Sequence, residues 1–327
     1  MFMQKVINRT LYTDQTHPYY VFTSDIHGNA NTLPLIKQAL SDFPSAQLVG
    51  GGDYIDGRKN SKQVCDYLMA QAEHGAVILN GNHEELMLNF ANGRDLGESG
   101  ISPLWYVNGG KTTMRSFLGR GYSKPKTADM LKQTKYYDFF SNRNYMYVTP
   151  AIIFVHGGVK PVADFDDPNI YHENVLDTGL NDYDFYRLWS RENYWYHEIL
   201  APNPHDYPQD YRQKFSVRND HIYLKTFAHN KTGHVIVTGH TPTTFLTGFF
   251  DDGRYLPPVA QSRCSVRVVK YQDEPARIFT DGGCHSRLPH NYGNVIVLDD
   301  HGRIVCVYDY RHQTGIAWTE YQKEQKK

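Results

Sequence analysis

Five short polar clusters in this sequence carry residue types that bind metal ions and transfer protons. They occupy residues 24–28, 50–58, 80–84, 156–158 and 239–242, and each follows a short apolar run. Short apolar runs that end in glycine-containing turns are typical of buried strands. Ligands bind at the carboxyl ends of the strands in open α/β sheets, so the sequence predicts one site built from these clusters.

The clusters offer a mixed set of metal donors. The six side chains are Asp25, His27, Asp53, Asn82, His156 and His240. Carboxylate, imidazole and amide donors together suit Mn, Fe or Zn better than Mg or Ca, which prefer oxygen ligands alone. Six donors are too many for one tetrahedral ion with an open position, but they can hold two ions if one carboxylate bridges. Two such ions clamp a phosphoryl group and lower the pKa of a bound water from about 15.7 to about 7. We therefore predict hydrolysis of a phosphate ester.

Glycines next to the donors strengthen this interpretation. Asp25 and His27 alone would be weak evidence, because a buried histidine is more often a structural residue than a ligand. Every candidate ligand, however, lies close to at least one of Gly28, Gly50, Gly51, Gly52, Gly57, Gly81, Gly157, Gly158 and Gly239. Glycine is expected where the backbone turns sharply and approaches an ion or a phosphate.

Taken in order, the motifs resemble those of a known family. The series Asp-x-His, Gly-Asp-x-x-Asp, Gly-Asn-His-Glu, His-Gly-Gly and Gly-His-Thr is similar to that of the calcineurin-like metallophosphoesterases, in particular their phosphoprotein phosphatase branch, from about residue 20 to residue 299. Residues 105–110 before Thr113, residues 188–192, and residues 279–284 followed by 293–298 look like bacterial members of that branch. These relatives include protein phosphatases and symmetrical dinucleoside tetraphosphate hydrolases.

The resemblance implies two divalent ions, expected to be Mn²⁺ with Fe or Zn as alternatives, that share the Asp53 carboxylate. The ligands of the first ion would be Asp25, His27 and Asp53, and those of the second would be Asp53, Asn82, His156 and His240. A hydroxide that bridges the ions would attack phosphorus in line with the leaving oxygen.

The resemblance also implies an acid and its partner. His83 would protonate the leaving oxygen, and Asp56 would orient the imidazole and stabilise its charge. Asn82 would contact the phosphate as well as an ion. We interpret Glu84 as support for the turn or the start of the following helix rather than as a catalytic group.

Two departures from the family pattern concern substrate binding. The family usually reads Asp-Arg-Gly after the second aspartate, whereas this chain reads Asp56-Gly57-Arg58. Either Arg58 reaches the phosphate from the next position, or Arg191 supplies the positive charge, since a guanidinium matches phosphate oxygens in pairs. The cluster around His240 lacks the second histidine of many nuclease-type relatives, which favours a protein or nucleotide phosphatase.

Composition excludes several classes of function. A net charge of −1 gives no basic excess for nucleic-acid binding. No apolar run approaches the roughly 18 residues of a membrane span, and residues 1–5 do not resemble a signal peptide, so we expect a cytoplasmic protein. The four cysteines lack paired Cys-x-x-Cys spacing, which argues against disulfides and a thiolate zinc site. No motif for a specific protein partner is present, and a phosphoprotein or a small phosphorylated compound is the expected substrate.

The candidate ligands extend across most of the 327 residues, so we predict a single catalytic domain. Periodicity predicts helices at 31–40 and 62–74, the second capped by Asn60 or Ser61, and strands at 277–281, 294–298 and 303–308. These elements indicate an α/β protein with an antiparallel portion. The resemblance implies a layered α-β-β-α sandwich of two mixed sheets flanked by helices. We add a helical insert at about 85–145, an aromatic-rich cap segment at about 181–216 and a solvated tail at 319–327.

Three functions remain open on the sequence. The first is a serine/threonine-type protein phosphatase that hydrolyses phosphate monoesters. The second is a dinucleoside polyphosphate or nucleotide hydrolase, in which aromatic residues of the cap segment would stack on a base. Such aromatic clusters are more often packed core. The third is a metal-binding scaffold without catalysis, which the complete set of ligands with His83 and Asp56 makes the least favoured.

Overall fold

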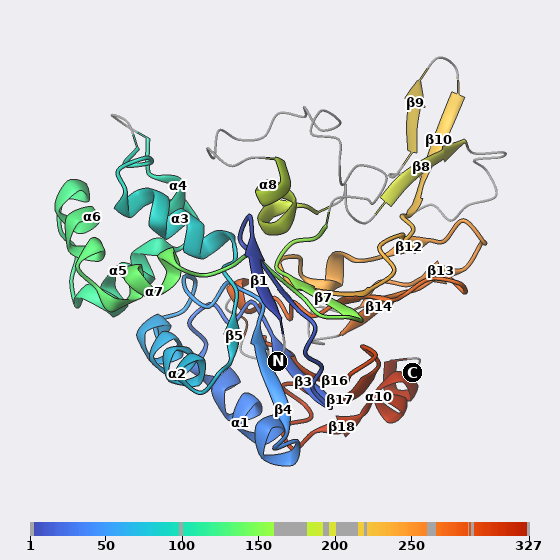
Figure 1. Cartoon of the computed structure of the whole chain (residues 1–327). Coiled ribbons are helices and arrows are strands. Elements are labelled where there is room, and N and C mark those ends of the chain that lie inside the picture. Colours follow the sequence, from blue (N-terminus) through green and yellow to red (C-terminus); the bar gives the residue numbers. More distant parts are fainter. Residues whose placement is uncertain are drawn as a thin grey trace.

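Two mixed sheets lie at the centre of the molecule (Figure 1). The computed structural model describes residues 3–97, 101–159, 182–191, 196–200, 215–218, 221–259, 266–286, 288 and 291–325. Within these residues the predicted α/β class and the layered arrangement of sheets and helices are confirmed.

The first central sheet has six strands in the order β18-β17-β16-β3-β4-β5. Their bounds are Tyr19–Thr23 (β3), Ala46–Gly50 (β4), Val77–Ile78 (β5), Val295–Asp299 (β16), Ile304–Tyr308 (β17) and Ile316–Ala317 (β18). Strand β3 pairs in parallel with β4, and β4 pairs in parallel with β5. The carboxyl ends of these three strands therefore meet at one edge.

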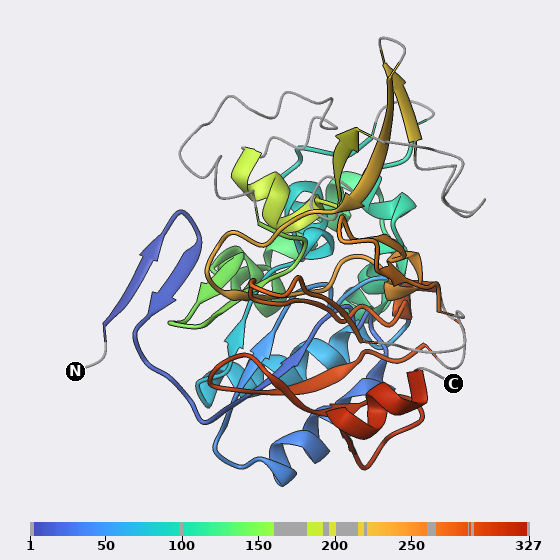
Figure 2. The same cartoon turned by 90° about the vertical axis from the view of Figure 1, so that its right-hand side faces the viewer.

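The second central sheet has seven strands in the order β1-β2-β6-β7-β11-β15-β14. Their bounds are Gln4–Ile7 (β1), Thr10–Thr13 (β2), Met146–Val148 (β6), Ile152–Val155 (β7), Val235–Thr238 (β11), Arg267–Val269 (β14) and Arg277–Phe279 (β15). Strand β11 pairs in parallel with both β7 and β15. Figure 2 shows the β1–β2 hairpin at one edge of the molecule.

The side chains of β3 point alternately to the two faces of its sheet and so contribute to two hydrophobic cores. Tyr20 and Phe22 point into the core between the two sheets, where they pack with Phe154 of β7. Val21, between them, belongs to the core on the opposite face, because successive side chains of a strand point to opposite sides. Helices α1 (Leu33–Asp42) and α2 (Ser61–Glu73) cover that opposite face.

A third sheet, which the sequence did not predict, packs beside the seven-stranded sheet. Its order is β13-β12-β10-β8, with β9 paired to β10. The bounds are Tyr196–Leu200 (β8), Phe215–Arg218 (β9), His221–Phe227 (β10), Gly248–Phe249 (β12) and Tyr255–Leu256 (β13). Phe227 and Tyr196 of this sheet share a buried cluster with Ile153 and Ile236 of the central sheet. Part of the central sheet is thus covered by strands rather than by a helix.

The predicted helical insert is confirmed. It consists of α3 (Asn82–Ala91), α4 (Leu104–Val107), α5 (Gly110–Leu118), α6 (Lys124–Lys132) and α7 (Lys135–Ser141), grouped together in Figure 1. The helix predicted at 31–40 begins later, after the 3-10 turn η1 (Ala30–Thr32), because Pro34 favours the first turn of a helix. The helix predicted at 62–74 is α2, although Asn60 makes no side-chain capping bond.

The predicted solvated tail is instead helix α10 (Trp318–Gln325). Tyr321 is fully buried in the core between the sheets, and its hydroxyl accepts a hydrogen bond from the Val266 amide at 3.1 Å. One buried aromatic ring therefore fixes a helix whose other residues are mostly charged or polar. Of the predicted cap segment, the structure describes α8 (Asp182–Trp189), Ser190, Arg191, β8 and β9, and the remainder lies outside the described residues.

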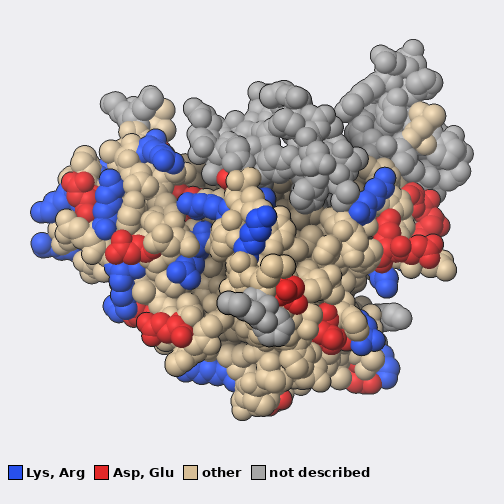
Figure 3. Space-filling model, in the orientation of Figure 1, with Lys and Arg blue, Asp and Glu red and all other residues tan. Residues whose placement is uncertain are grey.

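The surface carries no single dominant charge on the face seen in Figure 3. Basic side chains gather over the helical insert, and acidic side chains gather near the β12–β13 turn. No helix in the described part of the chain has the length and apolar character needed to cross a membrane. Cys65 and Cys306 are free thiols.

Candidate active site

The turns after the central strands hold an unusual backbone conformation. Five residues other than glycine have positive φ there: Asp25 (52°), His27 (48°), Asp53 (58°), Asp56 (68°) and His240 (65°). Among the described residues, the other two that share this conformation form the tip of the β1–β2 hairpin. Positive φ is uncommon outside glycine and is strained, so the surrounding contacts must hold it. The Asp25 amide donates to the Gly52 carbonyl, and the His27 amide donates to the Asp53 carbonyl, each at 2.9 Å.

These turns bring the predicted metal ligands into two adjoining groups. Ligand atoms of Asp25, His27 and Asp53 lie within 4.8 Å of one another, and so do those of Asp53, His156 and His240. All five side chains are buried. Asp53 belongs to both groups, as the predicted bridging carboxylate should.

Hydrogen bonds of the Nδ1 atoms orient two of the histidine rings in the site. The Nδ1 atoms of His27 and His156 lie 3.1 Å from the Ile55 carbonyl and 2.8 Å from the Gly51 carbonyl. A carbonyl only accepts, so each Nδ1 carries the proton and each Nε2 is directed to the site.

The Nε2 atom of His156 lies 2.9 Å from Asn82 Oδ1 and 3.3 Å from Asp53 Oδ2. Three acceptor-type atoms this close require a proton or a cation between them. Burial lowers the pKa of His156, but Asp53, Asp25 and the Gly51 carbonyl together raise it to about 9. A divalent ion would satisfy the same atoms as that proton.

His240 provides a separate test of the metal site. Its Nε2 is buried and has no hydrogen-bond partner within the described residues. Burial and the nearby Arg191 hold the pKa of His240 well below its usual value, so the ring is neutral. A buried, unprotonated imidazole nitrogen without a partner fits a metal ligand. The donor set and its geometry therefore fit divalent metal ions.

The predicted acid pair is formed. His83 Nδ1 lies 2.8 Å from Asp56 Oδ2, and both side chains are buried. Burial alone would lower the pKa of His83, but Asp53 and Asp56 raise it to about 9, so the imidazole is protonated at neutral pH. Two residues of the helical insert hold Asp56: Thr113 Oγ1 donates to it at 2.6 Å and Trp105 Nε1 at 3.0 Å. The sequence contained both of them in its family-like stretch but gave no role for either.

Glu84 supports the turn, as predicted. Its carboxylate accepts hydrogen bonds from the amides of Gly81, Asp53 and Tyr54 at 2.8–2.9 Å. A single buried carboxylate thus connects the start of α3 to the turn that carries Asp53.

The two candidate arginines lie in different places. Arg191 is exposed and lines the pocket, and its guanidinium donates to the His240 carbonyl at 2.9 Å. Arg58 donates instead to the backbone carbonyls of Cys284 (3.1 Å), Leu288 (2.8 Å) and Asn291 (3.3 Å). Arg58 is not among the residues that line the pocket, and its Nε and Nη2 atoms donate to this loop. The structure therefore does not support the prediction that Arg58 binds phosphate.

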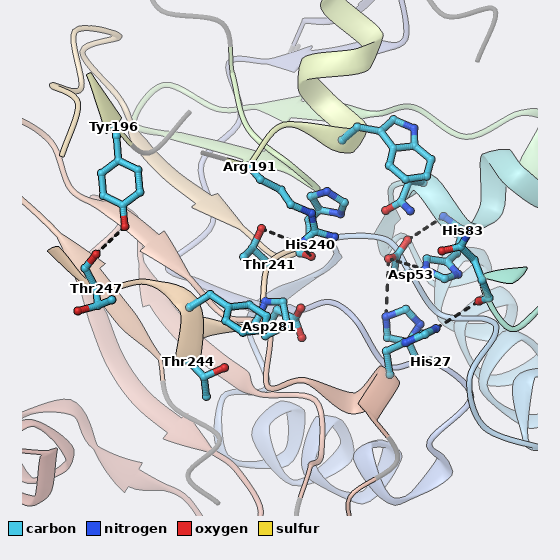
Figure 4. A pocket seen from close by; sticks show the side chains of 16 residues that line it. His27, Asp53, His83, Arg191, Tyr196, His240, Thr241, Thr244, Thr247 and Asp281 are labelled. Carbon is cyan, nitrogen blue, oxygen red and sulfur yellow. Dashed lines mark hydrogen bonds and ion pairs between the residues drawn. The ribbon is translucent and has the colours of Figure 1, made fainter. Parts of the chain in front are cut away.

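The pocket has a volume of about 670 Å³ and two distinct ends. In Figure 4, His27, Asp53 and His83 lie at one end, and Tyr196 lies at the other, beyond Arg191 and His240. Together with Phe245, Tyr196 forms what we call the aromatic wall of the pocket, whereas the ring of Trp189 lies 6.0 Å from that of His240. A ligand of this volume can be considerably larger than a phosphate group.

Sequence reasoning missed several polar residues of the pocket, among them Asp281 and His285. Asp281 is buried, and its carboxylate accepts a hydrogen bond from the Gly283 amide at 2.7 Å. Burial and the charge of Asp53 raise the pKa of Asp281 to about 6. The only signal for Asp281 was its place in the family-like stretch at 279–284, and no signal pointed to His285.

Comparison with known families agrees with this geometry. Residues 19–244, well over half of the chain, match the family model described as calcineurin-like phosphoesterase. The chain belongs to the calcineurin-like phosphoesterase family. It is therefore a hydrolase that acts on phosphoester bonds, and the family's divalent metal ions have candidate ligands in the His and Asp groups described above.

Several solved structures of phosphatases are similar to this phosphoesterase at low sequence identity. A variant of a cold-active protein tyrosine phosphatase is 16% identical, with 96% of this chain and 83% of that chain covered and a TM-score of 0.51. A candidate diadenosine tetraphosphatase is 14% identical (coverage 92% and 97%, TM-score 0.43). A Saccharomyces cerevisiae protein serine/threonine phosphatase similar to human PP5 is 14% identical (coverage 87% and 74%, TM-score 0.44). No curated protein sequence matches the chain.

Proposed function

We propose that this phosphoesterase is a serine/threonine-type protein phosphatase that hydrolyses phosphate monoesters with two divalent ions. Asp25, His27 and Asp53 would hold one ion, and Asp53 would share the second with the donors around His156. Bound ions of this kind polarise the phosphoryl oxygens and supply a nucleophile at neutral pH. Mn²⁺ as the native ion and a cytoplasmic location stay predictions.

The observation that carries the proposal is the buried pair of His83 and Asp56 beside Asp53. His83 Nε2 lies 3.7 Å from Asp53 Oδ2, so the protonated imidazole faces the carboxylate shared by both metal groups. An alkoxide such as that of serine or threonine is a poor leaving group and needs a proton as the P–O bond breaks. A positioned general acid contributes about 10²–10⁴-fold to such a step. The pair therefore favours alkyl phosphate esters.

Arg191 is the chain's best candidate for binding the phosphoryl oxygens. Its position beside His240 places a positive charge at the rim of the metal groups, and its side chain is exposed to the pocket. Asn82, whose amide oxygen faces His156, would contact the phosphate with its remaining amide protons.

A second candidate function is hydrolysis of a dinucleoside polyphosphate. The aromatic wall favours it, because an exposed ring such as that of Phe245 can stack on a base for about 1–3 kcal/mol. The third possibility, a scaffold without catalysis, would not explain the buried contact between His83 and Asp56.

The test compares three substrates on one preparation. The protein is reconstituted with Mn²⁺, and turnover is measured on para-nitrophenyl phosphate, a phosphothreonine peptide and diadenosine tetraphosphate. We expect the peptide to be preferred. Preference for the dinucleotide would support the second function, and silence on all three with full metal content would support the scaffold. The Asp53→Asn variant and a chelator-treated sample control for contaminating phosphatase.

A further inference from the structure

The carboxylate of Asp56 is held from the side of the helical insert. Trp105 Nε1 donates to both of its oxygens, at 3.1 Å to Oδ1 and 3.0 Å to Oδ2. The Thr113 hydroxyl donates to Oδ1 at 2.6 Å, and His83 Nδ1 lies 2.8 Å from Oδ2. Trp105, Thr113 and Asp56 are fully buried. Three side chains thus converge on one carboxylate that solvent does not reach.

The same hydroxyl also fixes the backbone of Asp56. The Asp56 amide donates to Thr113 Oγ1 at 2.7 Å, at a residue whose φ is +68°. Ser61 Oγ lies 3.0 Å from Thr113 Oγ1. The one proton of the Thr113 hydroxyl goes to the carboxylate, so Ser61 is the donor in that contact. Thr113 therefore binds both the main chain and the side chain of Asp56, which helps to hold the strained φ.

Close packing of backbone brings the insert against this turn. Gly109 lies between α4 and α5 with a φ of +98°, and a Cβ atom there would lie 2.8 Å from the Gly57 amide nitrogen. A Cβ atom on Gly110 would lie 2.5 Å from the Trp105 ring. A larger residue at either position would push the insert or the indole away from Asp56. Glycine at both positions therefore allows this close approach.

The bonds to Asp56 decide which nitrogen of His83 is left for the substrate. Burial raises the pKa of the Asp56 carboxyl, and the bonds from His83 and Thr113 oppose this rise. A carboxylate only accepts, so His83 donates through Nδ1, and Nε2 is the nitrogen that carries a proton for the leaving oxygen. The torsion about the Cβ–Cγ bond of an aspartate is soft. Without Trp105 and Thr113 the carboxylate could turn, and the imidazole would turn with it.

We propose that Trp105 and Thr113 are positioning residues for protonation of the leaving oxygen. They hold Asp56, and Asp56 holds the Nδ1 proton of His83. As the P–O bond breaks, the proton on Nε2 passes to the leaving oxygen; the ring becomes neutral and takes up another proton from solvent before the next cycle. This inference rests on the proposed phosphomonoesterase function, and it makes the helical insert necessary for one step of the reaction.

The first test replaces Thr113 with valine, which has nearly the same shape but no hydroxyl. We expect kcat on the phosphothreonine peptide to fall about 10- to 100-fold, the usual effect of losing a hydrogen bond to a charged group. The kcat on para-nitrophenyl phosphate should change little, because nitrophenolate leaves without a proton. KM for both substrates and the metal content should stay near the parent values. Thr113→Ser, which restores the hydroxyl, should recover most of the activity on the peptide.

Thr127→Val is the matched control. Thr127 is a fully buried threonine of α6 in the same insert, and its hydroxyl donates to Met114 Sδ at 3.9 Å rather than to Asp56. We expect its ratio of peptide turnover to aryl phosphate turnover to equal that of the parent even if Tm falls. Both rates are measured on one preparation, so their ratio does not depend on the folded fraction. A parent-like ratio in Thr113→Val, or the same drop in ratio in Thr127→Val, would overturn the inference.

Trp105→Phe tests the second donor. Trp105 packs against Phe90 with ring centroids 5.0 Å apart, and phenylalanine keeps a ring there while it removes the Nε1 proton. We expect the same selective loss on the peptide, together with a lower Tm because the smaller ring leaves a gap. Equal losses on the peptide and on the aryl phosphate would show that Trp105 supports the fold alone and would overturn its positioning role.

The Nδ1 proton of His83 separates this inference from the proposed function, because it is measured without turnover. It is observed by NMR in protein loaded with Zn²⁺, which is diamagnetic, and containing isotope-labelled histidine; its loss in His83→Ala identifies it. We expect its exchange with water to be faster in Thr113→Val and unchanged in Thr127→Val. Parent turnover of the peptide with unchanged exchange and substrate ratio in Thr113→Val would refute the inference alone. A parent that hydrolyses no ester, with faster exchange in Thr113→Val, would refute the proposed function and leave the positioning role standing.

Discussion

The two ends of the pocket are built in different ways. At the catalytic end, Asp25, His27 and Asp53 are at most 3% exposed and sit on strained backbone at strand ends. The aromatic wall uses side chains from short elements, and Phe245 is 57% exposed on the 3-10 turn η5 (Thr243–Phe245). The side chains at the catalytic end are thus held by the backbone of the central sheets, whereas the aromatic wall includes an exposed ring on a short turn.

Of the substitutions considered, Asp53→Asn should cause the largest loss of activity and should affect only the catalytic end of the pocket. We expect nearly all activity to be lost and metal content to fall, because an amide is a poor bridge between two cations. Asparagine tolerates positive φ, so the turn itself should survive. Elemental analysis and circular dichroism measure metal and fold together. Full occupancy by two ions in this variant would contradict the bridging role.

His83→Ala should have the next largest effect. On an alkyl phosphate we expect a loss of about 10²–10⁴-fold, the scale of a general acid. An aryl phosphate should suffer much less, because its phenolate leaves without a proton. The ratio of the two losses is the measurement, with metal content as the control. Equal losses on both substrates would show that His83 does not act as the acid.

Phe245→Ala tests the aromatic wall. We expect kcat on para-nitrophenyl phosphate and metal content to remain near those of the parent, because the ring contacts none of the ligands. If a base stacks on this ring, KM for diadenosine tetraphosphate should rise by about fivefold or more, the lower limit of a stacking contribution. Thr244→Ala, on the same turn, is the matched control. A loss of metal content in Phe245→Ala would show that the two ends are coupled.

Asp281→Asn should have the smallest effect, on the stability of the metal-free protein. Burial raises the pKa of Asp281 from 3.8 to about 6, so the folded state retains a proton that the unfolded state loses. Stability therefore falls as pH rises from about 4 to about 6 in the parent, and asparagine removes this contribution. The Tm of the variant minus that of the parent should increase over this interval. A difference that is independent of pH would contradict this account.

The ligands and the acid pair could be predicted because their signals are local. Asp25 and His27 follow β3 directly, and Asp53 and Asp56 follow β4. Parallel pairing of adjacent strands then brings these four residues together. His156 and His240 follow strands of the other central sheet, so their approach depends on how the sheets pack. The same reasoning placed Glu84 correctly, because a carboxylate in the first turn of a helix readily accepts free amide protons.

Other features depend on contacts that no local pattern contains. Arg58 lies 226 residues from the carbonyl of Cys284 that it binds, and Asp56 lies 57 residues from Thr113. Tyr321, in a segment of polar and charged residues, becomes a core residue because the gap between the sheets accepts its ring.

The sequence by itself thus predicted which side chains meet at the strand ends, the contact between His83 and Asp56, and the central parallel strands. Only the tertiary structure decided which arginine faces the pocket, that α10 is a packed helix, and that His285 and Asp281 join the site. The physical reason is that a short motif directly after a strand is positioned by that strand. The direction of a long side chain, in contrast, is set by the distant backbone groups that accept hydrogen bonds from its donors.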